Sequence, residues 1–281
     1  MKDLVGKRAL LTGANGGLGP WLARALAVAG MDVAVSGTSG AELNNVAEEV
    51  RSLGRRSAVF PADLRFSEQV SWLAREADAV WGGIDVLINN AGLEYTVPFF
   101  RLPEEQMCEV IEVNLTAPLR LTGILINGMI ERGWGHVVNM SSLAAKAGPA
   151  CQEAYAATKA ALIAFSLSLR ATCRGTGVSA SAVCPGFVET GIYARIVQRT
   201  GCRAPFLLAP IPPERVAKAV IRAIRCDEAE VLVSKFPVRP ILAVMALAPA
   251  LGLRLVDWLG AHEFFRRVAA RLNSPPTDPL G

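Results

Sequence analysis

The chain alternates short apolar runs with longer amphipathic stretches. Seven runs rich in Val, Ile, Leu and Ala end in polar or glycine residues, and they span residues 8–13, 32–37, 57–63, 85–92, 136–142, 178–186 and 231–234. The stretches between them, such as 22–30 and 42–54, carry apolar residues at helical spacing. Continuous apolar strands that alternate with helices are typical of a parallel sheet covered on both faces. The pattern therefore predicts an α/β fold with a doubly wound, seven-stranded, mainly parallel sheet.

The pattern changes after Ser234, which predicts one domain over residues 1–235 and an apolar helical extension over 236–281. Residues 240–253 carry no charge, but these fourteen residues are fewer than the roughly twenty that a membrane-spanning helix needs. The extension could form a lid over a substrate cleft, an oligomer contact or an interfacial helix. In the last case the lipid headgroups would meet Arg239, Arg254, Arg266, Arg267 and Arg271. We expect the tail 274–281 to be loose.

Composition excludes several classes of protein. With 281 residues, 52% of them hydrophobic, the chain can bury a sizeable core, and its net charge of +4 is too scattered to indicate nucleic-acid binding. Six cysteines without metal-ligand spacing predict buried, reduced thiols, and His136 and His262 lack the companions of a metal site. We therefore expect the protein to bind no metal. The N-terminus has no signal-peptide pattern, so we expect a cytoplasmic protein.

The first apolar run ends in the glycine-rich turn TGANGGLGP, residues 12–20. Gly13, Gly17 and Gly19 permit a tight turn, a close approach of the backbone to a pyrophosphate and close packing of the next helix. The N-terminus of that helix offers free N–H donors to an anion, and Pro20 suits its first turn. A glycine cluster alone is a weak signal, but its place between a strand and a helix favours a dinucleotide site.

The spacing Gly-x-x-x-Gly-x-Gly after a threonine resembles the single-domain short-chain dehydrogenases/reductases, and later motifs agree in order over residues 8–191. The resemblance implies a Rossmann-type fold whose NAD(P)-binding catalytic domain occupies residues 1–235. Within it, the segment 89–92 (NNAG) resembles the stretch that lines the adenosine side of the cofactor, Asp63 matches the aspartate that meets the adenine amine, and residues 184–191 match the Pro-Gly loop. The implied cofactor-binding residues are Gly13, Asn15, Gly16, Gly17, Leu18, Gly19, Thr38, Ser39, Asp63, Leu64, Asn90, Ala91, Gly92, Tyr155, Lys159, Pro185, Gly186, Val188 and Thr190.

The end of the second strand bears on the choice of dinucleotide. An acidic residue there would bind the ribose 2′-hydroxyl of NAD and repel a 2′-phosphate. This chain has Gly37, Thr38 and Ser39 instead. NADP(H) is therefore favoured, although Asn15 replaces the basic residue of many NADP-using relatives, and NAD(H) stays possible.

Tyr155 and Lys159 are four residues apart and share one helix face. A nearby cation favours the phenolate, so we expect it to lower the tyrosine pKa from about 10 and to allow acid/base work near neutrality. Ser142 ends an apolar strand thirteen residues before Tyr155, which places it at the ligand-binding edge of the sheet. These three residues match the serine, tyrosine and lysine of the family, and Asn114 matches its asparagine, which is associated with a helix irregularity and a water relay. The neighbouring Ser141 is excluded by the spacing.

The resemblance implies hydride transfer between nicotinamide C4 and a substrate carbonyl carbon. Tyr155 would transfer the proton, Ser142 would polarise the carbonyl oxygen, and Lys159 would bind the nicotinamide ribose. We expect an NADP(H)-dependent carbonyl reductase or alcohol dehydrogenase that acts on a lipophilic small molecule as a homodimer or homotetramer, with a possible peripheral membrane contact. A non-catalytic dinucleotide-binding sensor or scaffold is the alternative, and an epimerase or dehydratase ranks third.

Overall fold

The computed structural model describes residues 1–272 and confirms the predicted sheet. Its strand order is β3-β2-β1-β4-β5-β6-β7, and every neighbouring pair is parallel. The strands are β1 (Arg8–Leu11), β2 (Asp32–Gly37), β3 (Ser57–Pro61), β4 (Val86–Asn89), β5 (Gly135–Met140), β6 (Val178–Pro185) and β7 (Glu230–Val233). The prediction for the tail 274–281 lies outside the described residues.

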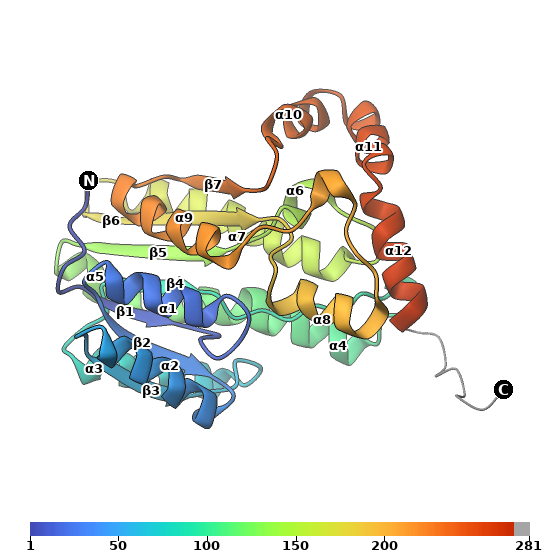
Figure 1. Ribbon diagram of the computed structural model, residues 1–281. Coiled ribbons are helices and arrows are strands. Elements are labelled where there is room, and N and C mark those ends of the chain that lie inside the picture. Colours follow the sequence, from blue (N-terminus) through green and yellow to red (C-terminus); the bar gives the residue numbers. More distant parts are fainter. Residues whose placement is uncertain (273–281) are drawn as a thin grey trace, which may run out of the picture.

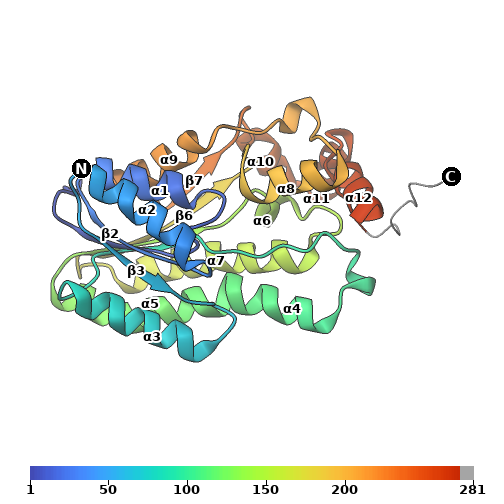
Figure 2. The same ribbon diagram turned by 60° about the horizontal axis from the view of Figure 1, so that its bottom comes forward.

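Helices cover both faces of the sheet (Figure 2). One face carries α1 (Gly19–Val28), α2 (Gly40–Ser52) and α9 (Pro213–Cys226), and the other carries α3 (Ser67–Val80), α5 (Ala117–Glu131) and α7 (Glu153–Thr172). Successive strand residues serve opposite faces: Ala9 and Leu11 of β1 pack with the first group, and Leu10 packs with the second. All three are fully buried, which explains why the strands read as unbroken apolar runs.

The strand order reverses between β1 and β4, so the chain leaves these two neighbours toward opposite sides. Such a reversal opens a crevice at the carboxyl ends of the strands. Around this edge lie α6 (Ala144–Ala147), α8 (Gly191–Thr200) and the short helices η1 (Phe99–Arg101) and η3 (Phe206–Leu208) (Figure 1). The helix α4 (Glu104–Ile111) continues through η2 (Glu112–Thr116) into α5.

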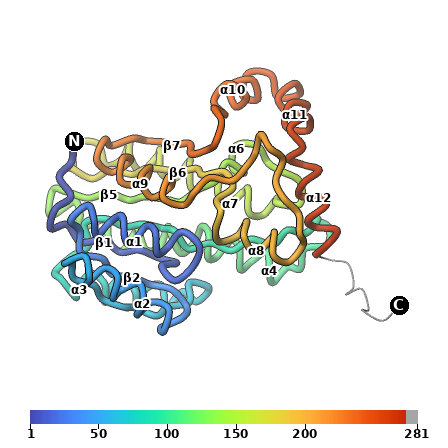
Figure 3. Tube along the Cα trace, in the orientation of Figure 1, coloured from blue at the N-terminus to red at the C-terminus, as the bar shows by residue number. Residues whose placement is uncertain are grey.

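The extension forms α10 (Arg239–Leu247), α11 (Pro249–Trp258) and α12 (Ala261–Leu272). Phe264, Phe265 and Val268 of α12 are buried against Phe187 and Ile196, so this helix joins the segment around α8 in a small separate core. The helices α10 and α11 pack against each other and project beyond β7 (Figure 3). Within residues 1–272, no helix combines the length and the apolar character needed to cross a bilayer.

Candidate active site

A cavity of about 830 Å³ lies at the carboxyl edge of the sheet. Most of the predicted site residues line it: Gly13, Asn15, Gly16, Gly17, Leu18, Thr38, Asp63, Leu64, Asn90, Ala91, Gly92, Ser142, Tyr155, Lys159, Pro185, Gly186, Val188 and Thr190. Three predicted residues, Gly19, Ser39 and Asn114, are not part of its wall. The cavity therefore brings the glycine turn and the Ser-Tyr-Lys group to one continuous space.

The glycines of the turn have separate packing reasons. Gly13 has φ +63°, and a Cβ there would lie 2.8 Å from the Cα of Ala91. A Cβ on Gly19 would lie 2.3 Å from the carbonyl oxygen of Ala14, so this glycine permits close packing inside the turn rather than contact with a ligand. Side chains at these positions would break the turn, whereas Gly16 has open space beside it. The turn can thus present bare backbone to a phosphate group.

The NNAG segment fixes the gap between β1 and β4. The Asn90 amide nitrogen donates to the carbonyl oxygens of Thr12 and Gly13, both at 3.0 Å. The Thr12 hydroxyl oxygen in turn accepts the backbone N–H groups of Asn90 and Ala91. These bonds hold the glycine turn in register with the end of β4.

Asp63, which the resemblance assigns to the adenine amine, is paired with a cation that the sequence analysis did not identify. The Arg65 guanidinium contacts the Asp63 carboxylate at 2.6 Å and Glu109 at 2.8 Å. The hydrogen bond from Arg65 holds the pKa of Asp63 below its usual range. Only the spacing of two residues between Asp63 and Arg65 could have signalled this pair.

An unpredicted carboxylate lies on the first turn of α2, after the end of β2. Asn15 donates from its amide nitrogen to Glu42 at 2.8 Å, and a Cβ on Gly37 would collide with the Asn15 amide oxygen. Thr38 lines the cavity, but Ser39 precedes α2 without a side-chain capping bond. Glu42 lies four residues beyond Thr38, on the first turn of α2, and so outside the strand end that sequence reasoning considered.

The catalytic candidates come from β5 and α7. Ser142 follows β5 in the cavity wall, with its hydroxyl oxygen accepting the N–H of Ala144. The Lys159 ammonium donates to the carbonyl oxygen of Met140 at 2.9 Å and lies 5.6 Å from the centroid of the Tyr155 ring. The Ser141 hydroxyl donates to the Lys159 carbonyl at 2.7 Å. Ser141 thus supports the backbone of α7, and Ser142 is the serine left to face a substrate.

Electrostatics at the tyrosine differ from the expectation. Burial raises the pKa of Tyr155 to about 12, and the negative charge of Glu94 adds to this, while the hydrogen bond with Ser142 acts in the opposite direction. Burial also lowers the pKa of Lys159 to about 8. The expected lowering of the tyrosine pKa by Lys159 is not seen in the chain alone, where desolvation of the phenol is the largest influence. The protonated phenol is the form that can donate to a carbonyl oxygen.

Asn114 lies in η2, a π-helical segment between α4 and α5. Its side chain accepts the N–H of Leu93 at 2.8 Å and donates to the Leu93 carbonyl at 2.9 Å. It also donates to the Thr158 hydroxyl at 3.3 Å. The expected helix irregularity is therefore present, and Asn114 connects the loop after β4 to α7 from behind the cavity wall.

The cysteines correct one expectation. Cys151, Cys173, Cys184 and Cys202 are buried free thiols, but Cys108 and Cys226 are exposed, because they lie on the solvent side of α4 and at the end of α9. Among residues 1–272, no three His, Cys, Asp or Glu side chains are grouped so that they could hold a metal ion.

Comparisons with known proteins agree with this geometry. A family model described as short chain dehydrogenase matches residues 7–201. The ketoacyl reductase HetN of Nostoc sp. is 38% identical over 96% of this chain and 94% of its own length. The 3-oxoacyl-(acyl-carrier-protein) reductase FabG of Aquifex aeolicus is 37% identical over 68% of this chain and 77% of its own. The crystal structure of a metagenomic short-chain oxidoreductase in complex with NADP is 31% identical, has a TM-score of 0.70, and covers 83% of this chain and 98% of that one.

Proposed function

Because the chain belongs to the short chain dehydrogenase family and is an oxidoreductase, we propose that it catalyses NADP(H)-dependent interconversion of a lipophilic ketone and its secondary alcohol. One observation carries the proposal. Ser142, Tyr155 and Lys159 share the wall of a cavity that runs from the glycine turn to an apolar cover formed by the segment around α8 and by the extension. A 3-oxoacyl thioester is the substrate class that this cavity and the two ketoacyl reductase relatives support best.

The residues present fit a dinucleotide, since Gly13, Gly16 and Gly17 line the cavity without side chains and so leave backbone exposed to a phosphate group. When bound, the nicotinamide supplies or accepts the hydride. In reduction, Tyr155 donates its phenolic proton to the substrate oxygen, and Ser142 holds that oxygen by a hydrogen bond. Lys159 binds the ribose hydroxyls, and Asn114 positions the water through which Tyr155 regains a proton.

The preference for a lipophilic substrate rests on the far half of the cavity. Its wall there consists mainly of apolar side chains from the segment around α8 and from the extension, namely Phe187, Ile192, Leu207, Leu208, Val238, Ala261 and Phe265. Water is displaced from such a wall at a gain of about 25 cal/mol for each Å² of apolar surface covered. A longer acyl chain should therefore bind more tightly. The extension acts as a lid in this proposal.

The preference for NADP(H) rests on Thr38 in the cavity wall and on the absence of an acidic residue from the end of β2. Glu42 works against a 2′-phosphate, although its hydrogen bond to Asn15 ties it to the rim of the site.

The test is a steady-state assay with 3-oxoacyl thioesters of increasing chain length and with NADPH or NADH. We expect kcat/KM to rise by about fourfold for each added CH₂ that contacts the apolar wall, and to be larger with NADPH. Turnover of short polar ketones alone would overturn the lipophilic substrate. Binding of NADPH without turnover of any carbonyl compound would favour the non-catalytic sensor.

We also propose a homodimer or homotetramer. Phe99, Phe100 and Ile111 are exposed around η1 and α4, beside an apolar depression that reaches α7. Exposed apolar side chains that cluster in this way are typical of contact surfaces between proteins. Light scattering at several concentrations would measure the assembly, and a monomer at micromolar concentration would contradict it.

Peripheral membrane contact is proposed for the α10–α11 hairpin. Leu247 and Trp258 are 88% and 76% exposed, and Arg239 and Arg254 are exposed near them. Apolar side chains flanked by cations are typical of surfaces that lie at a bilayer interface. Cosedimentation with vesicles of 30% phosphatidylserine tests this. Equal recovery with and without vesicles would contradict it.

A further inference from the structure

Glu94 lies in the loop that follows the NNAG segment, and its carboxylate is fixed by two donors. Both the Thr96 hydroxyl and the Gln152 amide nitrogen donate to the carboxylate oxygen Oε1. The same Gln152 nitrogen also lies 2.9 Å from the Thr96 hydroxyl oxygen, so the three side chains form a closed group. Thr96 and Gln152 are only 2% and 3% exposed. A carboxylate held by two buried donors keeps its position when a substrate arrives.

This carboxylate belongs to the reaction chamber. Glu94, Gln152 and Tyr155 all line the same cavity. Gln152, which holds the carboxylate, lies immediately before the first residue of α7 and three residues before Tyr155. The effect of the Glu94 charge on the Tyr155 hydroxyl is consistent with this proximity. A substrate whose carbonyl oxygen meets Tyr155 must place its neighbouring atoms near this negative charge.

No cation in the described part of the cavity wall forms an ion pair with it. None of the ion pairs formed by residues 1–272 involves Glu94. Lys159 is held by the Met140 carbonyl, and Arg65 is paired with acidic residues at the adenine end. Lys235 lies over aromatic rings of the cover, and Arg195 is exposed on α8.

We propose that Glu94 is a specificity-determining residue that restricts the cleft to carbonyl substrates without a negative charge next to the reacting group. A 3-oxo acid would bring its carboxylate toward Glu94, whereas an ester or thioester of the same acid would not. Two like charges separated by a few ångströms in a partly desolvated cleft repel strongly enough to reduce binding by about 10- to 100-fold. The inference rests on the proposed function and adds to it a residue that excludes free 3-oxo acids from the 3-oxoacyl substrate class.

The experiment compares 3-oxobutanoate with methyl 3-oxobutanoate, which present the same ketone and differ in charge. We expect the unmodified enzyme to have at least a 10-fold higher kcat/KM for the ester. In Glu94→Gln the charge is lost, but an amide oxygen remains to accept from Thr96 and Gln152. In this variant the ratio of kcat/KM for the acid to kcat/KM for the ester should rise by about 10- to 100-fold, and this ratio cancels any common effect of the substitution on Tyr155.

Glu76→Gln is the matched control, because Glu76 is exposed on α3 and outside the cavity wall. It makes the same change in net charge and should leave the ratio of the two substrates unaltered. An unaltered ratio in Glu94→Gln, or equal use of acid and ester by the unmodified enzyme, would overturn the inference.

A binding measurement separates this inference from the proposed function. Calorimetry of the NADP-saturated protein with butanamide and with butanoate needs neither turnover nor a variant. Tighter binding of butanamide by 10-fold or more supports the role of Glu94 even if no ketone is reduced. Equal affinities would overturn that role even if 3-oxoacyl thioesters prove to be good substrates.

Discussion

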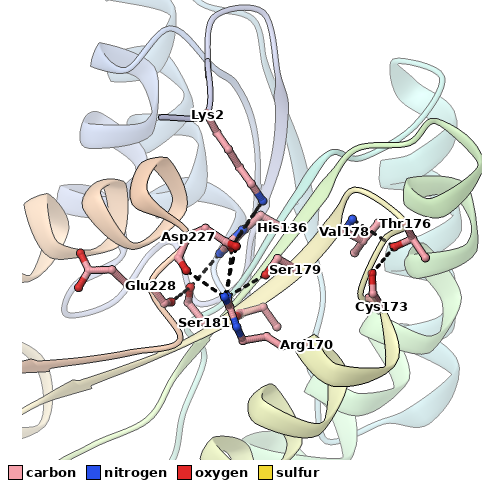
Figure 4. Close-up of polar contacts among 11 residues, drawn as sticks. Lys2, His136, Arg170, Cys173, Thr176, Val178, Ser179, Ser181, Asp227 and Glu228 are labelled. Carbon is pink, nitrogen blue, oxygen red and sulfur yellow. Dashed lines mark hydrogen bonds and ion pairs between the residues drawn. The ribbon is translucent and has the colours of Figure 1, made fainter.

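Polar groups gather at both ends of the strands β5 and β6. The two groups differ in whether a substrate can reach them. At the carboxyl end, Ser142, Tyr155 and Lys159 line an open cavity. At the amino end, His136 and Ser181 lie in a closed cluster with Lys2, Arg170 and Asp227 (Figure 4). Both clusters contain a serine and a lysine, and they differ in whether a substrate can reach the serine.

The amino-end cluster is saturated by its own hydrogen bonds. Lys2 donates to His136 Nδ1 at 3.2 Å, His136 Nε2 donates to the Ser181 hydroxyl at 2.8 Å, and that hydroxyl donates to the Glu228 carbonyl at 2.5 Å. His136 and Ser181 are completely buried. Serine, histidine and aspartate here have the composition of a hydrolytic triad, but the serine proton is committed and no substrate can reach it. Access and an uncommitted proton, rather than residue types, separate a catalytic group from a structural one.

The substitution Tyr155→Phe should distinguish the two ends most strongly. Because it removes the proton donor but keeps the ring, we expect kcat to fall by about 10³-fold. The free energy of unfolding should change by less than about 1 kcal/mol, and NADPH binding should remain. Activity assays, urea unfolding and fluorescence titration measure the three quantities. A loss of stability comparable to the loss of activity would mean that the carboxyl end is also structural.

At the amino end we expect a loss of stability when the pH falls, whereas Tyr155→Phe is expected to reduce activity and to leave stability nearly unchanged. Burial lowers the pKa of His136 to about 3, whereas an unfolded histidine has a pKa near 6.5. The unfolded state therefore binds more protons below pH 6.5, and stability is present above that value and lost as the pH falls toward 3. Between pH 7 and pH 5 we expect a loss of about 2 kcal/mol in the free energy of unfolding.

Urea unfolding at the two pH values measures this loss, and His136→Gln is the variant that should flatten the dependence. The carboxyl groups Asp32, Asp85 and Asp227 have lowered pKa values and titrate below this window. An equal pH dependence in the variant would assign the effect to other groups.

The smallest expected effect concerns the rim of the carboxyl-end site. Glu42→Gln removes a charge that would oppose a 2′-phosphate and keeps an acceptor for Asn15. We expect the affinity for NADPH to rise by about 3- to 10-fold at low salt, and that for NADH to change by less than twofold. Equal shifts for both cofactors would show that Glu42 does not meet the 2′ position.

Much of the fold could be predicted from local pattern. All seven apolar runs form strands, since a buried parallel strand needs apolar residues on both faces. The glycine turn, Ser142 and the Tyr155–Lys159 spacing also place their residues in one cavity. The assignment of Ser39 to the cofactor site remains a prediction, because the residue precedes α2 and lies outside the cavity wall. The sequence analysis identified neither Glu94 nor Arg65. Their partners Gln152 and Glu109 are distant in sequence, and neither pair forms a motif.

The sequence alone determined the order of the elements and the identity of the candidate catalytic groups, because both depend on spacing along one strand or one helix. Tertiary structure decided what surrounds those groups. It set the pKa of Tyr155, buried the His136 cluster, exposed Cys108 and brought the extension over the cavity. Desolvation and charge proximity depend on which distant segments pack together, and a local pattern does not record that.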